Sequence, residues 1–249
     1  MIVSSPGSLS SQDQQQDEKL DEKQVVREYF NSTGFERWRR IYGQDKVNLV
    51  QKDIRQGHEW TLALVLEWLQ DLTPEHTVCD AGCGVGSLSL PLAQRGIPVF
   101  ASDISEAMVG EARQRQQALL GSLANPQFSV QDLEAIQGSY DVVVCLDVMI
   151  HYPEAEALKM LTHLTSLAKE RLIFSFAPQT PLLNLLKKIG QLFPGASKTT
   201  RAYQHRETVL VAHLNELGWQ VSRRATIASR FYFAWLLELR PAYKTSRQS

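Results

Sequence analysis

A short apolar strand runs directly into a glycine-rich turn at residues 78–86, where the sequence reads VCDAGCGVG. Gly82, Gly84 and Gly86 have no Cβ, which allows the backbone to turn sharply and to approach a ligand closely. The following residues predict a helix over 87–94, whose free amide groups and positive dipole end suit a carboxylate. Strand, glycine turn and helix in this order predict an α/β domain that binds a ligand at the turn.

Strands and helices alternate along the rest of the chain and extend this unit. Strands are predicted at residues 76–80, 98–102, 128–131, 140–146 and 171–177. Helices are predicted at residues 105–119, 154–168 and 206–217, the first with Ser105 as its N-cap. Such alternation implies a parallel sheet with right-handed crossovers. Two last strands, at residues 220–225 and 231–239, read as a hairpin and therefore as an antiparallel edge.

Two segments exceed what such a core needs, and we expect them to cover a substrate. Residues 23–56 are predicted as an N-terminal helical cap, with two short helices broken near Gly34, after a disordered tail over 1–22. The core is predicted over 57–249, beginning with a helix at 57–72. Within it, residues 179–205 form a substrate-lid insert with one helix at 182–192.

Two acidic residues narrow the range of ligands that the turn could bind. Asp103 ends the second strand about twenty residues beyond the turn, where an acid can accept both hydroxyls of a ribose. Asp132 and Leu133 follow the third strand, where an acid beside an apolar neighbour can meet an adenine amino group. The Gly-x-Gly-x-Gly spacing after Asp80 differs from that of pyrophosphate binders, and no P-loop Lys-Ser/Thr pair follows it. A ligand with adenine, ribose and an amino-acid end but no phosphate is S-adenosylmethionine.

Composition excludes several classes of protein. A net charge of −1 and a pI near 6.6 argue against nucleic-acid binding, and no apolar run is long enough for a transmembrane helix. Cys79, Cys83 and Cys145 lie in apolar or glycine-rich surroundings, which predicts reduced, buried thiols in an intracellular protein. They lack the spacing of a zinc site, so we predict no protein metal site. The first twenty residues fit neither a secretory signal nor a transit peptide.

The stretch at residues 78–86 resembles the first motif of class I S-adenosylmethionine-dependent methyltransferases, and Asp103 resembles the ribose-binding acid of their second strand. The resemblance covers about residues 60–240. It implies a Rossmann-like class I methyltransferase fold, with a seven-stranded, mostly parallel sheet and an antiparallel C-terminal hairpin. Residues expected to contact S-adenosylmethionine, or its product S-adenosylhomocysteine, are Asp80, Gly82, Cys83, Gly84, Gly86, Asp103, Ile104, Asp132, Leu133 and Leu146.

Further segments resemble one branch of this class, the magnesium-protoporphyrin IX methyltransferases of chlorophyll biosynthesis. These segments are residues 29–43 (YFNSTGFERWRRIYG), 53–58 (DIRQGH), 146–152 (LDVMIHY) and 231–233 (FYF). The resemblance implies an O-methyltransferase that esterifies one propionate carboxylate of magnesium protoporphyrin IX, with magnesium present only inside this porphyrin. It also makes contact with the large subunit of magnesium chelatase plausible. With the first twenty residues, it favours a cytoplasmic protein of a cyanobacterium, peripheral at membranes.

The expected chemistry determines how the remaining candidate residues are read. A propionate titrates near the Glu reference pKa of about 4.3, so it is already an anion at neutral pH and needs no general base. We expect His151, which follows the fourth strand, to orient this carboxylate by a hydrogen bond. Tyr42 and Tyr29 in the cap are candidates for a second hydrogen bond or for stacking on the ring. The cations expected to receive the second propionate are Lys187, Lys188, Lys198, Arg201, His205 and Arg206.

Two alternatives stay open on the sequence alone. The first is a methyltransferase for another small acceptor, such as a phenol, an amine or a different acid. The second is a non-catalytic protein that binds porphyrin or S-adenosylmethionine, against which the intact glycine turn and its acids argue. Both alternatives have the same cofactor site as the expected enzyme, so only the cap and the insert distinguish the three readings. An oxidoreductase is disfavoured by the glycine spacing.

Overall fold

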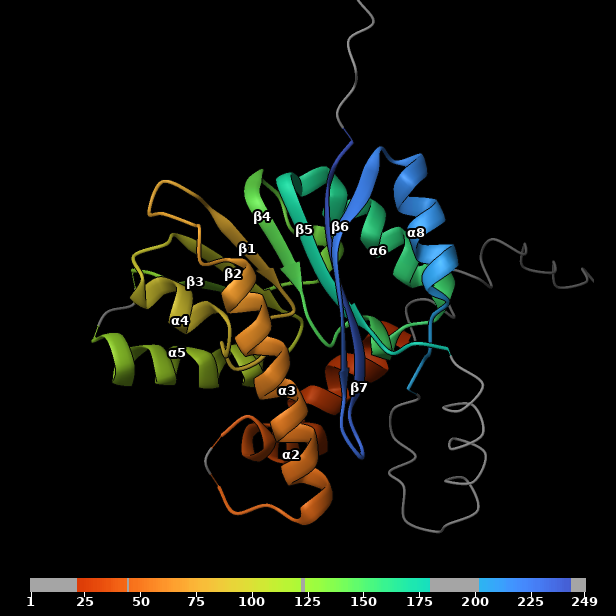
Figure 1. The fold of residues 1–249 in the computed structure, drawn as a ribbon. Helices are drawn as coiled ribbons and strands as arrows, with labels where there is room; N and C mark the ends of the chain where they lie inside the picture. The colour runs from red at the N-terminus through yellow and green to blue at the C-terminus, as the bar shows by residue number, and fades with distance from the viewer. Residues whose placement is uncertain (1–21, 44, 122–123, 180–201, 243–249) are drawn as a thin grey trace, which may run out of the picture.

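A seven-stranded mixed sheet forms the centre of the fold (Figure 1). The computed structural model describes residues 22–43, 45–121, 124–179 and 202–242. In chain order the strands are β1 (Val78–Ala81), β2 (Val99–Asp103), β3 (Gln127–Val130), β4 (Tyr140–Cys145), β5 (Ala168–Phe176), β6 (Trp219–Ala228) and β7 (Phe233–Pro241). Their order in the sheet is β3-β2-β1-β4-β5-β7-β6. Strands β1 to β5 are parallel, and β7 pairs antiparallel with both β5 and β6, which confirms the predicted sheet and its hairpin.

Helices cover both faces of the sheet (Figure 1). The helices α3 (Leu49–Trp68), α4 (Ser89–Gln94) and α5 (Glu106–Leu120) lie on one face, and α6 (Glu154–Leu167) and α8 (Glu207–Glu216) lie on the other. Successive side chains of β4 alternate between the two layers, with Val142 and Val144 in one core and Val143 and Cys145 in the other. Because both faces are covered, β4 is apolar along most of its length, as the sequence predicted.

The N-terminal segment lies beyond the ends toward which β4 and β5 run (Figure 1). Residues 22–31 are helical, the chain turns at Ser32, and α2 follows over Thr33–Ile41. The predicted break therefore occurs two residues before Gly34. Gly34 itself packs on the ring of Tyr29, where any Cβ would overlap it. No helix in the described part of the chain is long and apolar enough to cross a membrane.

The start of α3 corrects the sequence prediction. We expected a helix from residue 57, but α3 begins at Leu49. Asn48 and Gln51 form a capping box, in which the Asn48 side chain accepts from the Gln51 amide at 2.8 Å and Gln51 accepts from the Asn48 amide at 3.3 Å. The predicted boundary between cap and core, at residues 56 and 57, therefore lies inside a continuous helix. The predicted disordered tail over 1–22 lies outside the described residues except for Glu22, which is helical, and the predicted helix at 182–192 lies outside them entirely.

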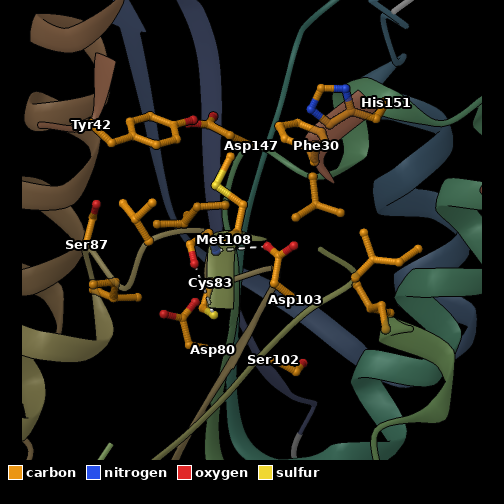
Figure 2. Close-up of a pocket in the computed structure, with 18 of the residues that line it drawn as sticks. Phe30, Tyr42, Asp80, Cys83, Ser87, Ser102, Asp103, Met108, Asp147 and His151 are labelled. Atoms are coloured by element: carbon orange, nitrogen blue, oxygen red, sulfur yellow. Dashed lines mark hydrogen bonds between the residues drawn. The ribbon is translucent and has the colours of Figure 1, made fainter. Parts of the chain in front are cut away.

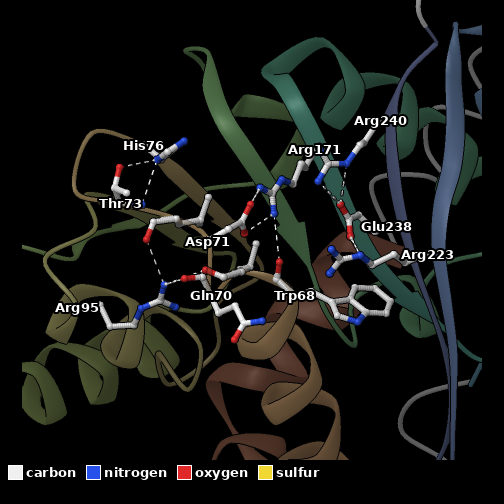
Figure 3. Close-up of polar contacts among 12 residues, drawn as sticks. Trp68, Gln70, Asp71, Thr73, His76, Arg95, Arg171, Arg223, Glu238 and Arg240 are labelled. Carbon is white, nitrogen blue, oxygen red and sulfur yellow. Dashed lines mark hydrogen bonds and ion pairs between the residues drawn. The ribbon is translucent and has the colours of Figure 1, made fainter.

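The C-terminal end of α3 is tied to the sheet by buried charges (Figure 3). Arg171 of β5 is buried, donates to the Trp68 carbonyl at 3.1 Å and forms a two-pronged ion pair with Asp71. Glu238 of β7 is fully buried and pairs with Arg223 at 3.2 Å and Arg240 at 3.0 Å. Removing one partner of a buried ion pair strongly destabilises a fold. Arg171 thus joins the end of α3 to β5, and Glu238 joins β7 to Arg223 of β6, whose guanidinium lies 5.9 Å from the Trp68 ring centroid.

The glycine turn has the sharply turned backbone conformation that its sequence predicts. Gly82, Gly84 and Gly86 have φ values of 85°, 52° and 80°, a left-handed region that glycine occupies without steric cost. A Cβ on Gly86 would press on Phe128 of β3, and one on Gly82 would overlap Val148. A Cβ on Gly84 would meet no heavy atom within 4 Å, so this glycine borders open space.

Replacement of Gly57 by alanine is expected to destabilise the protein, although alanine is the better helix former. A Cβ at residue 57 would overlap the ring of Tyr232, and such overpacking costs about 1–3 kcal/mol. Gly110 on α5 is a matched control, because a Cβ there meets nothing within 4 Å. We expect Gly110→Ala to stabilise by up to about 1 kcal/mol in urea unfolding. A Gly57→Ala variant as stable as Gly110→Ala would contradict the described packing.

Candidate active site

A cavity of about 920 Å³ of open space opens at the carboxyl ends of β1, β2 and β4 (Figure 2). Eight of the predicted cofactor residues line it, namely Asp80, Gly82, Cys83, Gly84, Asp103, Ile104, Leu133 and Leu146. In Figure 2, Asp80, Cys83 and Ser102 lie at one end, and Tyr42, Asp147, Phe30 and His151 lie at the other. Parallel strands bring their carboxyl ends to one edge of the sheet, which explains why residues from separate motifs meet here.

Asp103 is held for binding at the end of β2. Its carboxylate accepts the Gly84 amide and the Ser105 amide, each at 2.9 Å. Burial raises the pKa of Asp103, against these hydrogen bonds. A carboxylate has about four acceptor positions, so these amides leave room for a hydroxyl of a ligand. The position and free lone pairs fit the predicted ribose contact.

Asp80 is buried deeper, at the end of β1. Its carboxylate accepts the Ser89 hydroxyl at 2.5 Å. Burial raises the pKa of Asp80 to about 6, with a further increase from Asp103 and a decrease from Ser89 and His58. An acid of this kind favours a nearby cation, because a cation lowers the cost of its ionisation.

Asp132 and Gly86 do not line this cavity, whereas Gln131 and Leu133 do. The Asp132 carboxylate accepts the Glu134 amide at 3.1 Å, which caps the short helix η1 (Leu133–Ala135). It also pairs with Lys23 at 3.0 Å, and Lys23 contacts Glu134 at 2.5 Å. The direct adenine contact predicted for Asp132 therefore competes with a lysine of the N-terminal helix.

The N-terminal helix closes one side of the cavity. Val26 and Phe30 line it, and Lys23 ties the helix to the η1 loop. At the other end of the helix, the Ser105 hydroxyl donates to the Phe30 carbonyl at 3.0 Å, and the Asn31 side chain accepts the Ala107 amide at 3.1 Å. These bonds join residues 22–31 to the beginning of α5, beside Asp103.

A second cavity of about 860 Å³ of open space lies against the first. Its lining is rich in aromatic side chains, namely Trp38, Tyr42, Phe176, Phe231, Tyr232 and Phe233. Four residues line both cavities, and they are Tyr42, His58, Asp147 and His151. The two cavities therefore meet at this group, which we call the junction.

His151 and Tyr42 lie at the junction, as the sequence predicted, and Tyr29 does not. Burial lowers the pKa of His151 to about 4, with Asp147 opposing, so the imidazole is neutral at physiological pH. Burial and the charges of Asp147 and Asp103 raise the pKa of Tyr42, so its phenol keeps its hydrogen. Tyr29 lines neither cavity, and its hydroxyl accepts the Trp38 indole N–H at 3.2 Å.

Sequence reasoning missed His58 and Asp147. The His58 Nδ1 lies 2.9 Å from the Asp147 carboxylate, and the His58 ring stacks on Tyr42 with centroids 4.2 Å apart. Asp147 follows β4 at the same sheet edge as Asp103, so its position carried a usable signal. His58 carried none, because the predicted helix started at residue 57 and left its inner face undefined.

The cations expected from the insert are only partly described. Arg206 pairs with Glu154 at 2.7 Å. His205 is fully buried, and its Nε2 lies 2.8 Å from the Met149 carbonyl. Burial lowers the pKa of His205, so the expected cation is a neutral structural histidine. Lys187, Lys188, Lys198 and Arg201 lie outside the described residues. Cys79, Cys83 and Cys145 are free and buried, as predicted.

Known proteins share this fold and site. The family model "Magnesium-protoporphyrin IX methyltransferase C-terminus" matches residues 145–241, and "Methyltransferase domain" matches residues 78–171. The chain is 57% identical, over 88% of its length, to the magnesium-protoporphyrin O-methyltransferase of Synechocystis sp., of which the match covers 96%. The chain belongs to the magnesium-protoporphyrin O-methyltransferase family. The family resemblance noted in the sequence is thereby confirmed.

Solved structures agree with this membership of the magnesium-protoporphyrin O-methyltransferase family. A crystal structure of the Synechocystis PCC 6803 magnesium protoporphyrin IX methyltransferase with bound S-adenosylhomocysteine has a TM-score of 0.83 at 54% identity. It covers 88% of this chain and all (100%) of that chain. A second structure, with bound S-adenosylmethionine, has a TM-score of 0.78 at 46% identity and covers 96% of this chain and 100% of that chain. The class I methyltransferase fold predicted from the sequence is confirmed.

Cofactor affinity is expected to weaken as the pH falls through about 6. Asp80 has a pKa of about 6 in the free protein, and the ammonium and sulfonium groups of S-adenosylmethionine favour its ionised form. Below that pH a proton must leave before the cofactor binds, so affinity falls up to about tenfold per pH unit. Calorimetric titration with S-adenosylmethionine between about pH 5 and pH 8 measures this change in affinity. Asp80→Asn should bind more weakly at neutral pH but with a flat profile; an unchanged slope in that variant would contradict the assignment.

Proposed function

We propose that this chain transfers the methyl group of S-adenosylmethionine to one propionate carboxylate of magnesium protoporphyrin IX, giving the monomethyl ester in chlorophyll biosynthesis. The observation that carries this proposal is the junction, where a cavity lined by the glycine turn meets an aromatic cavity. Methyl transfer requires cofactor and acceptor to touch at one point, and holding them there can lower the barrier by about 7–11 kcal/mol. The 57% identity with the Synechocystis enzyme supports the choice of acceptor.

The first cavity fits each part of the cofactor. Asp103 offers lone pairs to the ribose, Asp80 favours the cationic amino-acid end, and Gly84 leaves room for close approach. Leu133 and Ile104 supply apolar surface for the adenine. Gly86 supports the turn by packing on Phe128, and Asp132 tethers the N-terminal helix through Lys23. When bound, the cofactor supplies an electrophilic methyl group on a sulfur that leaves with its electron pair.

The residues at the junction bind and orient the acceptor. A propionate is already ionised at neutral pH, so no side chain has to remove a proton from it. A pKa of about 4 makes His151 a poor base, which agrees with a role as a hydrogen-bond donor to one carboxylate oxygen. The neutral phenol of Tyr42 is placed to donate a second hydrogen bond or to stack on the ring. Tyr29 supports Trp38 and does not meet the acceptor.

The aromatic cavity suits a flat macrocycle. Aromatic side chains line it, with Trp38 and Tyr42 tilted by 32° at 5.3 Å on one wall and Phe231 and Phe233 from the β6–β7 turn on another. Such side chains offer large apolar area and favourable ring contacts to a porphyrin. The predicted lid over residues 179–205 remains part of this proposal and borders the cavity through Ala202.

Partner and location remain predictions. Contact with the large subunit of magnesium chelatase would pass on an apolar substrate without release into water. The Synechocystis relative, matched over 96% of its length, supports a cyanobacterial setting. A cytoplasmic protein that is peripheral at membranes remains part of the proposal.

A methyl-label assay tests the proposed function. The protein is incubated with methyl-labelled S-adenosylmethionine and magnesium protoporphyrin IX, and label in the porphyrin monomethyl ester is counted. The dimethyl ester of the same porphyrin is the matched control, because it has no free carboxylate. We expect label in the diacid only. No transfer to the diacid, or equal transfer to the dimethyl ester, would contradict carboxylate methylation.

Tyr42 and Tyr29 are expected to respond differently to the same change. Tyr42→Phe removes a donor at the junction and should lower kcat by about 10–100-fold, the range for a hydrogen bond to a charged group. Tyr29→Phe should keep kcat within about threefold and cost about 1 kcal/mol of stability, since it loses only the Trp38 bond. His151→Ala should behave like Tyr42→Phe. Steady-state kinetics with thermal unfolding decides this, and the reverse ranking would contradict the placement.

A further inference from the structure

Asp147 is a partly buried carboxylate with three donors around it. One oxygen lies 2.9 Å from His58 Nδ1, and the other accepts the Tyr232 hydroxyl at 2.9 Å and the Ser175 hydroxyl at 3.3 Å. Burial acts to raise the pKa of Asp147, but the bonds from His58, Tyr232 and Ser175 outweigh it and lower the pKa below its ordinary value. Asp147 is therefore ionised and only accepts hydrogen bonds, so Nδ1 of His58 carries a hydrogen.

The other ring nitrogen of His58 is unsatisfied. Nε2 is buried and has no hydrogen-bond partner among the described residues. A buried polar atom without a partner reduces stability, and such atoms are rare unless they serve a ligand or a reaction. Because Nδ1 faces Asp147, Nε2 lies on the part of the ring directed away from it. His58 borders both cavities, so this unsatisfied atom lies on a side chain of the junction.

The charged groups around His58 restrict which ligand its Nε2 atom can bind. Asp147 from the loop after β4 is its nearest ionised neighbour, and Asp80 at the end of β1 interacts with it electrostatically. Tyr42 from the end of α2 stacks on the ring, while the neutral His151 shares the junction. Tyr232 from the β6–β7 turn contacts the far side of Asp147. An acceptor carboxylate entering here would meet two anions and no cation among these groups except His58.

We propose that His58 binds the acceptor carboxylate directly, with Nε2–H donating to it while Asp147 holds Nδ1–H as a positioning residue. This inference rests on the proposed function, because the acceptor is taken to be a carboxylate. A carboxylate only accepts hydrogen bonds, so both ring nitrogens carry hydrogen in the complex. His58 and Asp147 then form a neutral pair, which removes the repulsion between Asp147 and the incoming anion. The bond to Asp147 fixes the ring orientation, as a second partner does for other functional histidines.

The same arrangement would have the opposite pH response if the acceptor were a hydroxyl group. A hydroxyl needs Nε2 as a base, so activity would fall as the pH falls. A carboxylate needs Nε2–H as a donor, so kcat/KM falls as the pH rises. The sign of the pH limb therefore distinguishes the two chemistries.

The test compares binding and kinetics in His58→Leu, His58→Gln and Asp147→Asn. His58→Leu should weaken binding of magnesium protoporphyrin IX by about 10–100-fold, measured by fluorescence titration, and leave binding of its dimethyl ester within about threefold. His58→Gln offers an amide donor near the Nε2 position and should recover at least about tenfold of this loss. Asp147→Asn should lower kcat more than it raises KM, because it disorients the ring.

The wild type should lose kcat/KM as the pH rises, and His58→Gln should lack this limb. His163→Leu is a matched control, since His163 bonds the Ile136 carbonyl away from both cavities, and it should retain the limb. Thermal unfolding close to that of the wild type in all variants separates the acceptor role from misfolding. Equal weakening of diacid and dimethyl ester, or a limb that persists in His58→Gln, would overturn the inference. A wild type that methylates neither compound would instead refute the proposed function.

Discussion

The fixed position of the Asp147 carboxylate is the constraint on which the junction depends. Asp147 is the only non-glycine residue in the described ranges with a positive φ, at 57°. Such a backbone costs about 1–3 kcal/mol and persists only where surrounding contacts fix it. Here the contacts come from α3 through His58, from β5 through Ser175 and from the β6–β7 turn through Tyr232. Asp147 held in this way lines both cavities.

Helix α3 is the element that transmits this constraint. Its C-terminal end is fixed to β5 by Arg171, which binds the Trp68 carbonyl and Asp71. In the middle of α3, Gly57 has no side chain. The ring of Tyr232 from the β6–β7 turn therefore lies directly against the helix backbone. Thr61, one turn later, bonds the Tyr232 hydroxyl at 3.0 Å. The helix thus holds His58 at the sheet edge, and Arg55 joins it to the preceding cap by donating to the carbonyls of Ile41 and Arg40.

Local signals predicted the sheet well, and they brought most of the expected cofactor residues to one cavity at its edge. Asp80, Asp103 and the glycine turn belong to a contiguous strand-turn-helix pattern, in which position along the chain fixes position at the sheet edge. Contacts between distant segments were not readable in the same way. His58 and Asp147 are 89 residues apart and Lys23 and Asp132 are 109 apart, and neither pair has a spacing that marks it. The capping box at Asn48 was a readable signal for the start of α3, and overlooking it hid the face that carries His58.

The most direct test is a crystal structure of the protein with S-adenosylhomocysteine and magnesium protoporphyrin IX bound together. Methyl transfer at the junction predicts one propionate carboxylate there, within hydrogen-bond distance of His151 and His58. Its nearer oxygen should face the cofactor sulfur across a gap wide enough for one methyl group, with the macrocycle in the aromatic cavity. A porphyrin bound with both propionates in solvent, or with its ring edge against the sulfur, would contradict this account.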